Sequence, residues 1–226
     1  LWVIEATDIV KKELPFSEVG LNVIFVDDLT PYRIRKVMIL NGAHTAMVAY
    51  GYLNGCRTVK ECLEKEPVAR FVREIIFEEI IPTLDLPNAE LTTFADDVLE
   101  RFQNPYIRHE LLSIALNSIP KFRVRVLPSI FKYYTLKNKL PENLIKAFAA
   151  LIVFYRGTYG GKEIILKDDA YNIKFMEDTW EYGDFKELVS DILSNKKLWN
   201  QDLTKILGLQ KQLIINIILL LEREYN

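Results

Sequence analysis

The sequence predicts a mainly α-helical protein with two short strands at its N-terminus. Proline occurs where helices commonly begin, as Pro31 does directly after the potential cap Thr30 and as Pro141 does later in the chain. Apolar side chains also recur at helical spacing, for example at Phe71 and Ile75. Because 50% of the 226 residues are hydrophobic and the mean hydropathy is +0.04, the chain can bury a substantial core.

Two runs rich in β-branched and aromatic residues predict the strands, at Leu1–Ala6 and Leu21–Val26. Between them, Val10–Gly20 is predicted to be a polar connection. The chain opens within an apolar run and without a methionine, so we expect further sequence before Leu1 and a sheet that continues there.

The predicted helical domain covers residues 31–226. Its first helix runs from Pro31 to Asn54, after which Gly55 can adopt the left-handed conformation that commonly ends a helix. Thr58 and Glu61 form a capping-box pattern that opens the next helix. Later helices are expected at 67–82, 88–102, 107–117, 122–136 with a break at Pro128, 141–156, 170–182, 185–195 and 209–225, with a small hairpin within 157–169.

Composition argues against several classes of function. The 29 Lys and Arg residues nearly balance the 31 Asp and Glu residues, so no overall field attracts nucleic acid or an anionic membrane. The longest apolar run, Leu213 to Leu221, is too short to span a membrane. Cys56 and Cys62 have no second Cys or His pair nearby, which argues against a zinc site and a disulfide framework and favours a reducing cytoplasm.

One stretch of the first helix combines three polar groups on an otherwise apolar face. On a helical wheel, Asn41 lies about 140° and His44 about 80° from Lys36. Burial of this face would favour the neutral amine of Lys36, which can take and give a proton. Asn41 and His44 can both donate a hydrogen bond to a reacting oxygen. About 12 Å of helix rise separates Lys36 from His44, so convergence requires the lysine to reach forward or the helix to bend.

Gly42 lies between the two hydrogen-bonding residues, and we expect a ligand or cofactor ring to approach the backbone at this position. The same spacing also fits a purely structural interpretation. Lys36 would then extend its ammonium to solvent, His44 would be a hydrogen-bonded core residue, and Asn41 would face water. Spacing alone leaves both interpretations open.

The sequence around these residues resembles a known family. Lys36-Val-Met-Ile-Leu-Asn41-Gly-Ala-His44, preceded by Asp27-Asp-Leu-Thr-Pro-Tyr32, is similar to the signature of the mannitol dehydrogenase family, the zinc-independent long-chain polyol and uronate oxidoreductases. Further similar segments are Arg101–Ile107, Leu112–Phe122 and Phe154–Gly157, so the similarity covers nearly the whole chain. Asn41-Gly-Ala-His-Thr45 with Glu78-Glu-Ile-Ile-Pro82 is similar to the tagaturonate reductase (altronate oxidoreductase) branch.

The resemblance implies a multi-helical C-terminal substrate domain, like that of 6-phosphogluconate dehydrogenase, in an NAD-dependent hexuronate oxidoreductase that interconverts tagaturonate and altronate. In the family, the lysine matched by Lys36 is the general acid/base, and the residues matched by Asn41 and His44 hold the reacting oxygen. Lys121 matches a lysine that contacts substrate hydroxyls. Ser113 stands where the mannitol branch usually carries an arginine, which favours a sugar acid as substrate.

A dinucleotide enzyme needs a Gly-rich strand-to-helix turn, and no such motif occurs among the 9 glycines of this chain. We therefore expect NAD to be bound mainly by a Rossmann domain that precedes this chain. Residues 1–30 would be its end, or the connection from it, and the fragment alone would be inactive.

The other candidate residues carry weaker signals. Arg123 and Arg125 follow Lys121, and each either binds a sugar carboxylate or lies on a solvated helix face. His109 is expected to be a partly exposed helical histidine, with no metal site in the chain. Two acidic pairs are expected to begin helices rather than to bind a cation, Asp96-Asp97 and Asp168-Asp169.

Two classes of function follow. The first is a cytoplasmic oxidoreductase domain that acts on a small sugar acid. Its partner would be its own N-terminal Rossmann domain, and it would bind neither nucleic acid nor a membrane. Fructuronate reductase and mannitol dehydrogenase are the alternatives within this class. The second is a non-catalytic helical interaction domain in which Lys36, Asn41 and His44 only pack.

Overall fold

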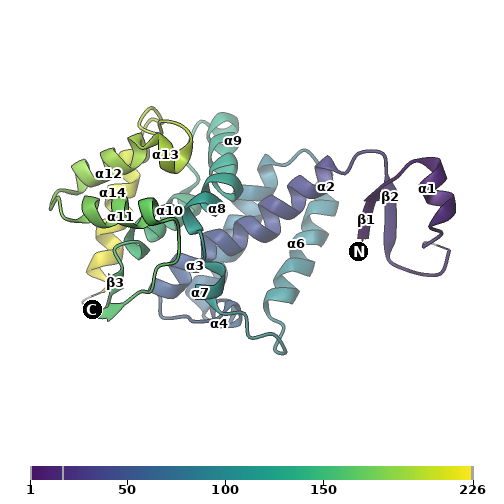
Figure 1. The fold of residues 1–226 in the computed structure, drawn as a ribbon, viewed down its shortest axis with the longest axis horizontal. Coiled ribbons are helices and arrows are strands. Elements are labelled where there is room, and N and C mark those ends of the chain that lie inside the picture. Colours follow the sequence, from purple (N-terminus) through teal and green to yellow (C-terminus); the bar gives the residue numbers. More distant parts are fainter. Residues whose placement is uncertain (1, 17, 225–226) are drawn as a thin grey trace.

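The computed structural model describes residues 2–16 and 18–224 (Figure 1). A small strand unit extends from one end of the molecule, and the remaining chain forms a larger helical body. This arrangement confirms the predicted mainly helical fold with two short N-terminal strands. Leu1, at the start of the first predicted strand, and Tyr225, at the end of the last predicted helix, lie outside the described residues.

The strand unit consists of two parallel strands. β1 (Trp2–Glu5) pairs with β2 (Val23–Val26), with Trp2 opposite Val23. The connection contains a helix, α1 (Asp8–Glu13), where the sequence predicted only a polar link. None of the residues of α1 is buried, so this helix has no side chain in the core.

The helical body begins with one continuous run composed of α2 (Thr30–Arg35), η1 (Lys36–Gly42) and α3 (Ala43–Leu53). This run confirms the predicted helix almost to the residue, and Gly55 follows it with a φ of +88°. Its middle part, η1, is a π-helix, in which each N–H pairs with the carbonyl five residues earlier. The sequence did not predict this change of helix type.

The remaining elements are mostly helices. They are α4 (Val59–Glu64), α5 (Glu66–Glu74), the π-helix η2 (Ile75–Ile80), the 3₁₀ turn η3 (Ile81–Thr83), α6 (Asn88–Phe102), α7 (Leu111–Ile114), α8 (Ser118–Arg125), α9 (Leu127–Lys137), α10 (Glu142–Phe154), the hairpin strands β3 (Thr158–Tyr159) and β4 (Lys162–Glu163), α11 (Ala170–Trp180), α12 (Phe185–Ser194), α13 (Lys196–Trp199) and α14 (Leu209–Glu222). The predicted bounds of α6 and the predicted hairpin are confirmed.

The prediction of a long helix over 107–117 is wrong, because only Leu111–Ile114 is helical. The chain before α7 is instead held as an extended segment against the start of α4. Glu110 forms a bridge with Thr58, and the His109 carbonyl oxygen accepts a hydrogen bond from the Val59 N–H at 3.0 Å. Tertiary pairing therefore overrides the local helical pattern.

Helix α10 lies at the centre of the core and packs against both α3 and α14. Near its middle, the Phe148 ring contacts Trp199 at 5.0 Å and Phe122 at 4.9 Å between ring centroids. All three side chains are almost completely buried. This packing joins the C-terminal helices to α8, which in turn crosses the run that carries the predicted catalytic residues.

The hairpin β3–β4 is attached to the end of α14 by polar contacts. The Arg156 guanidinium donates to both carboxylate oxygens of Glu224, at 2.6 and 2.7 Å, and the Gly160 N–H donates to the same carboxylate. Because the Glu224 side chain is only 6% exposed, this pair is shielded from water.

The predicted helix caps are confirmed only in part. The predicted cap at Thr30 is wrong, because Thr30 is itself the first residue of α2 and Leu29 takes the capping position. Thr58 accepts a hydrogen bond from the Glu61 N–H at 3.2 Å, and Asp169 caps α11 by accepting from the Tyr171 N–H at 2.9 Å. The acidic pair Asp96-Asp97 is different, because it lies inside α6 and does not begin it. For that pair the predicted helix start is wrong.

Candidate active site

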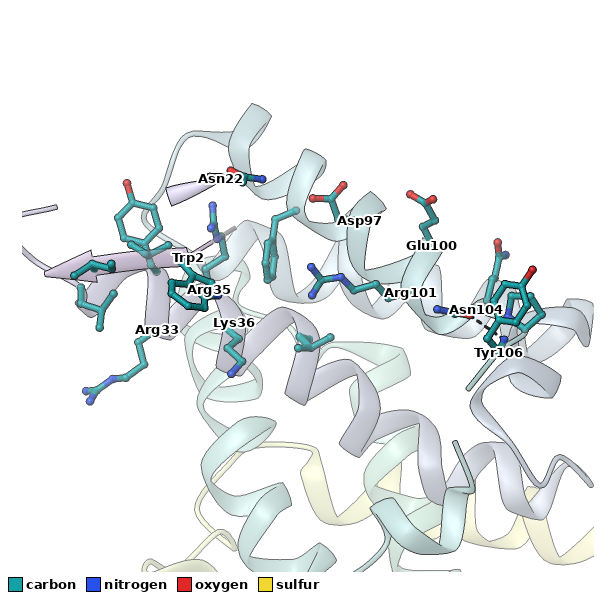
Figure 2. A pocket seen from close by; sticks show the side chains of 18 residues that line it. Trp2, Asn22, Arg33, Arg35, Lys36, Asp97, Glu100, Arg101, Asn104 and Tyr106 are labelled. Atoms are coloured by element: carbon teal, nitrogen blue, oxygen red, sulfur yellow. Dashed lines mark hydrogen bonds between the residues drawn. The ribbon is translucent and has the colours of Figure 1, made fainter. Parts of the chain in front are cut away.

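A cleft of about 1230 Å³ lies between the strand unit and the helical body. Its walls come from β1, from the run α2–η1, and from α6 with the loop that follows it (Figure 2). The cations Arg33, Lys36 and Arg101 line it, against two carboxylates, Asp97 and Glu100. Figure 2 shows Arg101 extending from α6 along the cleft toward the helix that carries Lys36.

Lys36 is the first residue of the π-helix, and its side chain is exposed at the cleft wall. The expectation that Lys36 is buried is therefore wrong for this chain. Its neighbour Arg35 is the buried cation, with 7% exposure, because its guanidinium stacks over Phe94 of α6 at 4.5 Å. Arg35 also approaches Glu90 at 3.8 Å. These contacts attach α2 to α6, and Lys36 is left facing the cleft.

Asn41 lies one π-helical turn beyond Lys36. In an α-helix the two side chains would point about 140° apart, but the i to i+5 pairing of η1 brings residues five apart closer to one face. Asn41 is half-buried, and its carbonyl oxygen accepts a hydrogen bond from the Thr45 hydroxyl at 2.8 Å. Its side-chain amide makes no hydrogen bond to any described residue.

His44 packs between two rings. It stacks on Phe102 at 4.1 Å between ring centroids and meets His109 edge-on at 5.2 Å. Burial lowers the pKa of His44 to about 3, and the nearby His109 and Arg125 act in the same direction. The imidazole is therefore neutral at pH 7. Its Nε2 atom is buried and has no hydrogen-bond partner among the described residues. The structural interpretation predicted a hydrogen-bonded core histidine, and for this atom that prediction is wrong.

Two expectations near His44 are wrong. His109 lies in the extended segment before α7 and not in a helix. Gly42 is buried beneath α8, because a Cβ atom at this position would lie 2.9 Å from the Arg125 carbonyl oxygen. The missing side chain of Gly42 therefore admits the backbone of α8, and no ligand approaches there.

Lys121 and the two arginines of α8 have different surroundings. The Lys121 ammonium donates to the Ile114 carbonyl oxygen at 2.9 Å, and burial and the charge of Arg125 lower the pKa of Lys121. Arg123 donates to the Leu198 carbonyl oxygen at 3.0 Å, a structural contact with α13. Arg125 is half-buried, and burial lowers its pKa, but its guanidinium makes no hydrogen bond or ion pair with the part of the chain that the structure describes.

The predicted site residues thus fall into two groups. Lys36 lines the cleft, whereas Asn41, His44 and Lys121 are not part of the cleft wall. His44 and Lys121 are instead linked through Arg125, which lies close enough to influence both. Sequence reasoning missed the packing of His44 against Phe102; the segment Arg101–Ile107 was the signal that could have indicated it.

Within the described residues, no cluster of three or more His, Cys, Asp or Glu side chains is arranged to hold a metal ion. The helices in the same residues are all too short or too polar to cross a membrane.

The carboxylate of Asp168 is used in hydrogen bonds within the protein. It accepts from the Asn172 side chain at 2.9 Å, from the Ile119 N–H at 3.1 Å and from the Tyr155 hydroxyl.

Solved structures define the class of fold. Mannitol 2-dehydrogenase of Pseudomonas fluorescens, solved as a ternary complex with NAD and D-mannitol, matches 93% of this chain and 41% of its own chain with a TM-score of 0.75 and 21% identity. A substrate-free D-sorbitol dehydrogenase matches 93% of this chain and 42% of its own, with a TM-score of 0.77 and 20% identity. The fold is that of the helical part of these polyol dehydrogenases.

Sequence comparison is more specific. The model of the mannitol dehydrogenase C-terminal domain matches residues 28–217, and this chain belongs to that family. Altronate oxidoreductase of Yersinia pestis bv. Antiqua (strain Nepal516) is 45% identical over 99% of this chain, and that of Bacillus subtilis (strain 168) is 47% identical over 91%. The chain spans about half the length of these relatives, 47% and 42% respectively. The predicted family resemblance is confirmed.

Proposed function

We propose that this chain is the C-terminal catalytic domain of an NAD-dependent hexuronate oxidoreductase that interconverts tagaturonate and altronate. The observation that carries the proposal is the 45% identity to an altronate oxidoreductase along 99% of the chain. The position of Lys36 on the wall of a large cleft, whose charged residues include more cations than carboxylates, supports it. The unpaired Cys56 and Cys62 suit the cytoplasmic location that we include in the proposal.

The cleft fits both a nicotinamide cofactor and a sugar. Its volume of about 1230 Å³ exceeds the roughly 300–1,000 Å³ that is typical of pockets for one small ligand. Arg33 and Arg101 would face the phosphates of the cofactor or the charge of a sugar acid. When bound, NAD would supply the hydride acceptor for the oxidation of altronate, and NADH the hydride donor for the reduction of tagaturonate.

Residues 1–30 would be the end of the nucleotide-binding half or the connection from it, and residues 31–226 the substrate domain. Parallel strands rarely stand alone, because parallel sheets are usually covered on both faces, and a two-stranded sheet is marginally stable. The parallel pair β1–β2 therefore suits the edge of a larger sheet.

Lys36 would act as the general acid/base. Its amine takes the proton from the reacting hydroxyl during oxidation, and its ammonium returns that proton during reduction. Asn41 and the neutral His44 would donate hydrogen bonds to the same oxygen, and the unpartnered Nε2 atom of His44 leaves one ring nitrogen free for this contact. Lys121 would bind substrate hydroxyls. Closure of the cleft over the sugar would then supply the desolvation of Lys36 that this chain alone lacks.

The first test measures substrate preference in the full-length protein. We expect tagaturonate to be reduced by NADH much faster than fructose, because Ser113 replaces the mannitol-branch arginine and the site is rich in cations. Equal or reversed rates would refute the sugar-acid assignment.

The second test replaces the proposed acid/base. Lys36→Ala in the full-length protein should abolish turnover with little change in the dissociation constant of NADH. The matched control is Lys132→Ala, which removes a lysine of α9 that pairs with Asp85 outside the cleft and should leave turnover intact. If Lys36→Ala retains most of its activity, Lys36 is not the acid/base.

A further inference from the structure

Two cationic side chains of α8 lie near the neutral His44, where α8 crosses the α2–η1–α3 run. We call them the Arg125 cluster: Arg125, Lys121 and His44. The charge of Arg125 influences both other members. Lys121 and Arg125 are one helical turn apart on α8, at i and i+4, which places them on the same face of that helix.

The crossing brings this face close to the predicted catalytic residues. At Gly42 the backbone of η1 approaches the Arg125 carbonyl oxygen so closely that a Cβ atom would lie 2.9 Å from it. Gly42 directly follows Asn41 and precedes His44 by two residues. The end of α8 is therefore fixed beside the two residues proposed to hold the reacting oxygen.

Arg125 differs from the neighbouring Arg123 in how its guanidinium is satisfied. The Nη1 atom of Arg123 donates hydrogen bonds to α13 and to Asn200, the residue that follows it, at 3.0 to 3.4 Å, whereas the buried Nε atom of Arg123 has no partner among the described residues. Arg125 is half-buried, and its guanidinium has no hydrogen-bond or ion-pair partner in the described parts of the chain. An anion placed against this half-buried guanidinium would be stabilised by charge-assisted hydrogen bonds.

The protein itself supplies little negative charge to this cluster. Asp168 lies near Lys121, but its carboxylate already accepts hydrogen bonds from Tyr155, Asn172 and the Ile119 N–H. A planar guanidinium matches a carboxylate in a two-point contact, whereas a lysine acts as a point charge. A carboxylate from outside the described chain would therefore match the geometry of Arg125.

We propose that Arg125 binds the carboxylate of the sugar acid and selects uronates over neutral ketoses. This assignment rests on the proposed function and adds a specificity-determining residue to it. Arg125 holds the charged end of the substrate from α8, and Asn41 and His44 hold the reacting oxygen from the crossing run.

The test compares tagaturonate with tagatose, which has a hydroxymethyl group in place of the carboxylate, in the full-length protein. Loss of a two-point, charge-assisted contact costs roughly 10- to 100-fold in binding. Arg125→Met should therefore lower kcat/KM for tagaturonate by about 10- to 100-fold, through a rise in KM. The kcat/KM for tagatose should fall far less. Arg125→Lys should lie between the wild type and Arg125→Met. Arg70→Met is the matched control, because it removes an exposed guanidinium of α5 that pairs with Glu66, and it should leave the kinetic constants for both substrates unchanged.

Calorimetric binding of altronate and of the matching hexitol provides a second readout that needs no turnover. Arg125→Met should weaken altronate binding and leave hexitol binding nearly unchanged. An equal loss for acid and neutral ligands, or no loss at all, overturns the role of Arg125. A wild-type protein without preference for tagaturonate would refute the proposed function itself, whereas a preference that survives in both Arg125 variants refutes only this assignment. Arg125→Lys keeps the test decisive if Arg125→Met does not fold.

Discussion

The burial of His44 predicts a specific sensitivity to acid. Its pKa is about 3 in the folded protein and 6.5 in an unfolded chain. Between these values the unfolded chain binds more protons, so the free energy of unfolding falls as the pH drops from 6.5 toward 3. Each pH unit below 6.5 lowers that free energy by about 1.4 kcal/mol, so His44 should cost about 3 kcal/mol of stability at pH 4 and almost nothing at pH 7.

The assay is urea unfolding of the wild type and of His44→Gln at pH 7 and pH 4. Other groups titrate in both proteins and cancel in the comparison. Glu79 is one of them, because burial raises its pKa to about 7. Between pH 7 and 4.5 the folded protein binds more protons at Glu79 than the unfolded chain does, so this group raises the free energy of unfolding as the pH falls. We expect the wild type to lose about 2 to 3 kcal/mol more than His44→Gln between pH 7 and pH 4.

Nuclear magnetic resonance can test the same point directly, since the chain contains only 2 histidines. In a His109→Gln variant, the single remaining imidazole should show no titration between pH 7 and pH 4. A midpoint near pH 6.5, or equal acid sensitivity of the wild type and His44→Gln, would refute the reasoning and indicate that water reaches the ring.

Three further predictions concern stability, each measured as the change in urea unfolding free energy at pH 7. Gly42→Ala should destabilise the protein by about 1 to 2 kcal/mol, because the clash with the Arg125 carbonyl outweighs the helix propensity of alanine, and a more stable variant would contradict the close crossing. Thr58→Ala should cost about 1 kcal/mol through loss of the α4 cap, whereas Thr58→Ser should cost less; equal losses would argue against the cap. Glu224→Gln should cost about 2 to 3 kcal/mol by leaving Arg156 underpaired, and an unchanged value would show that the hairpin is held by other contacts.

The sequence by itself determined where most helices lie. Local signals are sufficient for this, because a cap, a proline in the first turn or a left-handed glycine acts within a few residues. The bounds of α6, the cap at Thr58 and the end of the run before Gly55 were predictable for that reason. The segment from Lys36 to His44 also indicated the family.

Tertiary structure alone decided the helix type and the surroundings of each side chain. The crossing at Gly42 depends on α8, which is distant in sequence. The π-helix determines how Asn41 is oriented relative to Lys36. Burial of His44 depends on its stacking against Phe102. Arg125 has no acidic partner among the described residues, and the nearby carboxylate of Asp168 already accepts hydrogen bonds from other groups. Wheel geometry and spacing carry no information about such long-range neighbours, because they describe one helix in isolation.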